Sequence, residues 1–93
     1  METAYSSENY IGKYLIDRIR FDIFILNIAE KHSKNIYRVT GYCFSVSESI
    51  AFKNVNSTIV LDKDTKDIKI ITKEEYEEEI KRRLKNCKEV REW

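Results

Sequence analysis

The chain has 93 residues, of which 42% are hydrophobic and 35% are charged, so its composition is that of a globular domain and not of a disordered chain. Seventeen basic residues nearly balance sixteen acidic ones, and the net charge of +1 provides no overall attraction to nucleic acid, membrane or acidic substrate. A single domain, 1–93, is expected from this length, and the absence of a long apolar run or a signal-like N-terminus predicts a cytoplasmic protein without a membrane partner.

The N-terminal residues have the spacing of a short helix. Ser7 is a suitable N-cap. Four residues with helical spacing follow it: Ile11, Tyr14, Leu15 and Arg18. Gly12 would cost such a helix about 1 kcal/mol relative to alanine, but the pattern predicts a helix over residues 8–18.

Two long apolar runs, 21–28 and 36–46, are separated by the polar stretch 30–35 and predict a β-hairpin. Within the second run the pattern of large side chains changes at Gly41. Tyr37 and Val39 have one parity, whereas Tyr42, Phe44 and Val46 have the other. A β-bulge at Gly41 would bring both sets to one face of the sheet.

Residues 47–56 are compatible with two structures. The alternation of residues 50–53 favours a short strand, whereas Ser47 could be the N-cap of a short helix. The polar sequence 54–57 that follows is typical of a turn.

A second hairpin is predicted from two β-branched runs, 58–61 and 68–71, on either side of the turn-forming sequence 62–67. Thr72 and Glu75 then form a capping-box pattern, which predicts a helix over 73–89. Four apolar residues form one stripe along it: Tyr76, Ile80, Leu84 and Cys87.

These elements predict an α+β fold. It has a short N-terminal helix, an antiparallel sheet of four to five strands in meander-like hairpins, and a long C-terminal helix packed on one sheet face.

Residues suited to catalysis are sparse in this chain. The only histidine is His32, and the two cysteines, Cys43 and Cys87, have no metal-binding spacing. We expect both cysteines to be reduced and to fill structural positions. Two glycines are too few for a phosphate-binding loop. The sequence therefore predicts a protein that is not an enzyme, with no metal and no small-molecule cofactor.

The function predicted from these features is a small protein-binding module. Edge strands of a small sheet can accept a partner's strand, and aromatic residues near the termini are suited to an interface. The candidate partner-binding residues are Tyr5, Tyr10 and Trp93. The partner is expected to be another protein or a second copy. An inhibitor or accessory subunit of phage or mobile-element type, acting on a host protein, is the narrower prediction.

An alternative function is binding of single-stranded nucleic acid. In this hypothesis bases stack on aromatic side chains of the sheet while nearby cations contact the phosphates. The candidate residues are Phe24, Lys34, Arg38, Tyr42 and Phe44. The small net charge of +1 weighs against this alternative.

Overall fold

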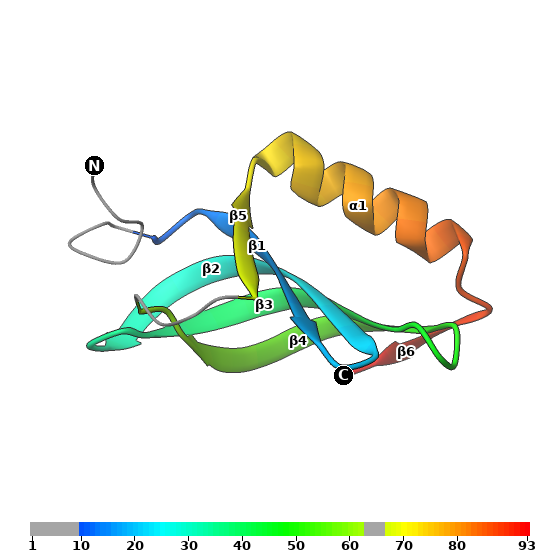
Figure 1. Cartoon of the computed structure of the whole chain (residues 1–93), viewed down its shortest axis with the longest axis horizontal. Helices are drawn as coiled ribbons and strands as arrows, with labels where there is room; N and C mark the ends of the chain where they lie inside the picture. Colours follow the sequence, from blue (N-terminus) through cyan, green and yellow to red (C-terminus); the bar gives the residue numbers. More distant parts are fainter. Residues whose placement is uncertain (1–9, 63–66) are drawn as a thin grey trace.

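A computed structural model describes residues 10–62 and 67–93 of the chain (Figure 1). Its elements are β1 (Tyr14–Ile19), β2 (Asp22–Ser33), β3 (Ile36–Ser45), β4 (Ile50–Val60), β5 (Ile68–Ile71), α1 (Lys73–Lys85) and β6 (Glu89–Glu92). The strands form one six-stranded sheet in the order β5-β1-β2-β3-β4-β6. Strands β1 to β4 form an antiparallel meander, β5 pairs with β1, and β6 pairs with β4 in parallel.

The expected fold is wrong at the N-terminus, because residues 14–18 of the region predicted as a helix over 8–18 belong to β1, and residues 8 and 9 lie outside the described residues. Among residues 10–18, Gly12 lies in a turn at φ +87° and the strand begins at Tyr14. Strand β1 pairs with β2 on one side and with β5 on the other. Hydrogen bonding to two neighbours outweighs a local helical spacing that is only a few residues long.

The strand pairing also differs from the expected hairpins. The hairpin between the runs 21–28 and 36–46 is confirmed as β2 and β3. The second hairpin is wrong, because β5 pairs with β1 and not with β4. The predicted turn at 54–57 is wrong as well, since these residues continue β4 as far as Val60. The sheet is therefore mixed and has six strands instead of four or five.

A β-bulge lies beside Gly41, but its extra residue is in β4. Gly41 faces Val55 and Cys43 faces Phe52, so two residues of β4 lie opposite one residue of β3. The left-handed conformation that this bulge needs is adopted by Asn54, with φ +59°.

Strand β3 therefore keeps its alternation. Tyr37 and Cys43 lie in one core cluster, whereas Tyr42 and Phe44 lie in the other. The expectation that a bulge brings both sets to one face is wrong.

The two faces of the sheet carry separate apolar clusters. We call the face beneath α1 the helix face and the opposite face the far face (Figure 1). The buried residues of the helix-face cluster are Ile23, Ile25, Phe44, Ala51 and Ile80. The buried residues of the far-face cluster are Tyr10, Leu15, Leu26, Ile28, Tyr37, Val39, Cys43, Val55 and Leu61. Neighbours such as Ile25 and Leu26 point to opposite faces, as strand geometry requires.

Helix α1 begins as predicted and ends early. The Thr72 hydroxyl accepts from the Glu75 amide, and the Glu75 carboxylate accepts from the Thr72 amide, which completes a capping box. The predicted stripe packs on the helix face, with Ile80 buried and Tyr76, Leu84 and Cys87 partly buried. The helix stops at Lys85 instead of residue 89, because the chain after it pairs with β4. Within the described residues, no helix has the length and apolarity needed to cross a membrane.

Candidate protein-binding site

One side of β4 is only partly covered by another strand. Strand β6 pairs with Ile50–Lys53, and the amide of Trp93 donates to the Lys53 carbonyl at 3.0 Å. Past this point, no strand in the described part of the chain pairs with the outer side of β4. We call residues 54–59, on the side facing away from β3, the β4 edge.

A hydrogen bond just beyond the β4 edge determines which of its backbone N–H and C=O groups point toward β3 and which point outward. The Leu61 amide donates to the Asn35 carbonyl at 2.7 Å, in the same register that pairs β3 with β4. Backbone groups alternate in direction along a strand. The N–H and C=O groups of Ser57 and Ile59 therefore point to β3, whereas those of Asn56 and Thr58 point outward.

The β4 edge lacks the charges that protect the other edges of this sheet. Its sequence, Asn-Val-Asn-Ser-Thr-Ile, contains neither charge nor proline. By contrast, β5 carries Lys69, and β6 carries Glu89, Arg91 and Glu92 among its four residues. Charged residues on edge strands discourage pairing with other chains. The β4 edge is thus the edge best suited to accept a strand.

An apolar groove lies on the far face beside this edge. Its volume is about 250 Å³ and it is open to solvent. The groove is lined by Asp17, Ile19, Phe24, Leu26, Val39, Ser57, Thr58, Ile59 and Val60. Burial and, to a lesser extent, the charge of Asp67 raise the pKa of the Asp17 carboxyl. The groove therefore combines an apolar lining with one carboxyl and adjoins the outward-facing backbone of β4.

The candidate residues near the termini have different positions. Tyr5 lies outside the described residues. Tyr10 is buried in the far-face cluster, with its ring edge-on to Tyr37 at a centroid distance of 5.6 Å. Trp93 is 54% exposed, and its ring lies 5.9 Å from Phe24 and 6.2 Å from Phe52. Of these three, Trp93 presents an accessible ring next to a groove residue.

The aromatic residues of the nucleic-acid hypothesis do not share a surface. Phe24 lies on the far face, whereas Tyr42 and Phe44 lie on the helix face, with their rings stacked at 5.8 Å. Phe44 is buried beneath α1.

The cations of that hypothesis lie apart from an aromatic platform. The Arg38 guanidinium pairs with Glu30 at 2.9 Å, and Lys34 is exposed in the β2–β3 turn. A base-stacking platform flanked by free cations is therefore not assembled by these five residues.

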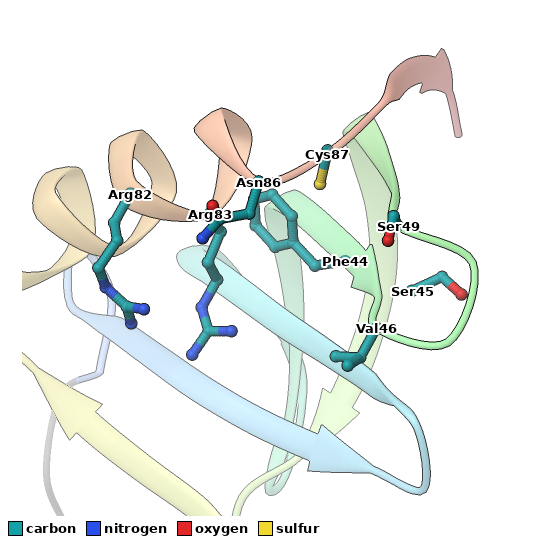
Figure 2. Close-up of a pocket in the computed structure, with 8 residues that line it drawn as sticks. All are labelled: Phe44, Ser45, Val46, Ser49, Arg82, Arg83, Asn86 and Cys87. Carbon is teal, nitrogen blue, oxygen red and sulfur yellow. The ribbon is translucent and has the colours of Figure 1, made fainter.

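A second pocket, of about 200 Å³, lies between the end of α1 and the turn after β3 (Figure 2). Arg82 and Arg83 extend in the same direction from α1, as Figure 2 shows. Both guanidinium groups contact the Glu79 carboxylate, at 2.6 and 3.0 Å respectively. Glu79 offsets one of the two positive charges, and cations near the C-terminus of a helix stabilise it. The position of the two arginines is therefore accounted for by the stability of α1, without a bound ligand.

The cysteines and the histidine have different environments. Burial, together with the charge of Asp22, raises the pKa of the Cys43 thiol to about 11. Burial also raises the pKa of Cys87, and Arg83 partly opposes the shift. His32 is exposed near the end of β2. No cluster of three or more His, Cys, Asp or Glu residues that could hold a metal occurs within residues 10–62 and 67–93.

The β4 edge is not predicted from the sequence, because its Asn and Ser residues are common in turns. Two signals in the sequence pointed to it. Val55, Ser57 and Ile59 have the period of a strand, and residues 54–59 carry no charge in a chain that is 35% charged.

Comparisons with family models, with curated proteins and with solved structures find no match to this chain.

Proposed function

We propose that this protein is a protein-binding module that accepts a partner's extended strand at the β4 edge. The observation that carries the proposal is the outward-facing backbone of Asn56 and Thr58 on a strand edge without charges. Such an edge is a template for strand addition, in which backbone hydrogen bonds supply affinity. The inhibitor or accessory-subunit role predicted from the sequence is a narrower form of this proposal.

The groove would supply specificity to this interaction. In an added strand, alternate side chains would point to the far face, where Phe24, Leu26 and Val39 line the groove. Each apolar side chain buried there contributes about 25 cal/mol per Å², and each backbone hydrogen bond contributes about 1 kcal/mol net. An extended segment with an apolar residue at the groove therefore fits this surface.

The test is a comparison of two substitutions at Thr58. Thr58→Pro removes the outward N–H, and proline is tolerated on an edge strand whose N–H faces solvent. Thr58→Val is the matched control, because it changes the side chain and keeps the N–H. Each protein is immobilised and exposed to lysate of the source cells and, separately, to free wild-type protein, and retained proteins are identified by mass spectrometry.

We expect wild type and Thr58→Val to retain the same protein, and Thr58→Pro to lose it while its far-ultraviolet circular dichroism stays unchanged. Equal retention by a folded Thr58→Pro variant would contradict the proposal. A single-stranded oligonucleotide at low salt tests the alternative function. We expect no gel retardation, and a salt-dependent shift that Thr58→Pro leaves intact would favour nucleic-acid binding instead.

A further inference from the structure

We propose that the strand bound at the β4 edge carries a lysine or arginine, whose aliphatic stem lies in the groove and whose charged group pairs with the Asp17 carboxylate. This inference rests on the proposed function and specifies the chemistry of the partner. Two observations carry it. Asp17 is the one charged residue in the lining of the groove, and no cation of the described residues pairs with it.

The Asp17 side chain lies among apolar residues of the far face. Asp17 is directly opposite Phe24 of β2 on one side and Ile68 of β5 on the other. Both of these residues pack against the far-face cluster, and residues directly opposite each other lie on the same face of a sheet. The carboxyl is therefore partly buried between two apolar side chains.

The surroundings of the Asp17 carboxyl lack a positive charge. Burial raises its pKa, and the charged group that adds to this shift is another acid, Asp67. By contrast, the Glu30 and Glu79 carboxylates contact arginines at 2.9 and 2.6 Å. A partly buried carboxylate without a cation is unfavourable in the free protein. A positive group that enters the groove would remove this cost.

Side chains of an added strand can enter the groove from two positions. Because the outward-facing backbone groups belong to Asn56 and Thr58, the partner residues opposite Ser57 and Ile59 form pairs without hydrogen bonds. Their side chains point to the same face as those of Ser57 and Ile59. Both of these residues line the groove together with Asp17, so such a side chain lies in the same cavity as the carboxylate.

The lining of the groove favours lysine or arginine at one of these two positions. Leucine or valine would bury area against Phe24, Leu26 and Val39 but would leave Asp17 without a cation. Lysine and arginine cover apolar surface with their methylene groups and carry a charge at the end. A hydrogen bond between two charged groups is about twice as strong as one between neutral groups. An acidic side chain would instead add a negative charge beside Asp17 and Asp67.

Two synthetic peptides test the preference for a cation. Each has the sequence valine, threonine, X, threonine, valine, with blocked ends, and X is arginine in one and citrulline in the other. Citrulline has the same stem without the charge. Both peptides are short, so they can pair with β4 beyond Lys53, where the Trp93 amide is bonded. In nuclear magnetic resonance titrations up to about 5 mM peptide, we expect the arginine peptide to have the lower dissociation constant, by about tenfold.

Three variants identify the groups responsible. Asp17→Asn removes the carboxylate and should make the two dissociation constants equal. Glu78→Gln removes the same charge from an exposed position of α1 and should keep the tenfold ratio. Thr58→Pro should raise both dissociation constants, because both peptides use the Thr58 N–H. In the free protein, Asp17→Asn should raise Tm by a few degrees, since it removes a partly buried charge without a cation. A lower Tm would show that the carboxyl has a partner within the protein and would overturn the inference.

Equal affinity of wild type for the two peptides would also overturn it. If Thr58→Pro then weakens both peptides, strand addition at the β4 edge stands and the cation is wrong. A tenfold ratio that persists in Asp17→Asn would assign the preference to another group, and the inference fails. If neither peptide binds, the inference is wrong, and the capture experiment with Thr58→Pro decides the proposed function separately.

Discussion

The amide of Leu61 donates a hydrogen bond to the carbonyl of Asn35 at 2.7 Å, and this bond fixes the direction of the backbone groups of the β4 edge from Ile59 back to Val55. It closes the far end of the β3–β4 ladder beside the β2–β3 turn. Because directions alternate from this point, the amides of Asn56 and Thr58 are left without a strand partner within the described residues.

Hydrogen exchange in dilute protein should reveal this alternation. We expect the amides of Asn56 and Thr58 to exchange much faster than those of Ser57 and Ile59, which donate to β3. Exchange followed residue by residue by nuclear magnetic resonance provides the measurement. Equal protection of all four amides would show that another segment covers the β4 edge.

Gly41 should tolerate no side chain. A Cβ built on it would overlap the Ile25 carbonyl oxygen and lie 3.0 Å from the Leu26 Cα, and its φ of +151° is unfavourable for other residues. We expect Gly41→Ala to lower the free energy of unfolding by about 3 kcal/mol, measured by urea denaturation.

Gly12→Ala is the matched control for this substitution. Gly12 also has a positive φ, +87°, but a Cβ there would meet no atom within 4 Å. Its backbone strain alone should cost about 1 kcal/mol. Equal losses for the two variants would contradict the close approach of β2 to β3 at Gly41.

The capping box should stabilise α1 in a pH-dependent way. Thr72→Ala removes the hydroxyl that accepts from the Glu75 amide at 3.0 Å, and should cost about 1 kcal/mol of unfolding free energy.

The pH dependence comes from Glu75. The hydrogen bond from the Thr72 amide lowers the pKa of the Glu75 carboxyl below 4.5. Its contribution is therefore complete above the ordinary pKa and is lost as pH falls through the lowered value. The stability difference between wild type and Glu75→Gln should shrink from about pH 6 to about pH 3, and a constant difference would contradict this assignment.

The two thiols should differ in reactivity. Cys43 is 3% exposed and its pKa is raised to about 11, so almost no thiolate forms near neutral pH. Cys87 is more exposed and lies in the pocket at the end of α1. With a chromogenic disulfide reagent, we expect the native protein to release the equivalent of one thiol, which Cys87→Ser abolishes. Rapid reaction of two thiols would show that Cys43 is accessible.

Helix α1 could be predicted because its signals are local. Thr72 and Glu75 are three residues apart, and Tyr76, Ile80 and Leu84 of the stripe lie within one element. Strand β1 could not be predicted from the sequence, because its conformation depends on pairing with β5. Tyr14 pairs with Ile71, far away in the sequence, and no local pattern contains that information.

The β4 edge and the groove beside it could not be predicted from the sequence for a related reason. Residues 54–57 contain turn-forming side chains, yet only Asn54 uses this property, at the left-handed position of the bulge. The groove joins Asp17 and Ile19 of β1 to the end of β4. Its residues come together only when the meander brings four strands into one sheet.

The most direct test of strand addition at the β4 edge is hydrogen exchange in the complex, with the arginine peptide or with the protein captured from lysate. We predict that the amides of Asn56 and Thr58 become protected when the complex forms, while the exposed amide of Ser47 exchanges at an unchanged rate. A complex in which Asn56 and Thr58 still exchange as in the free protein would contradict the account.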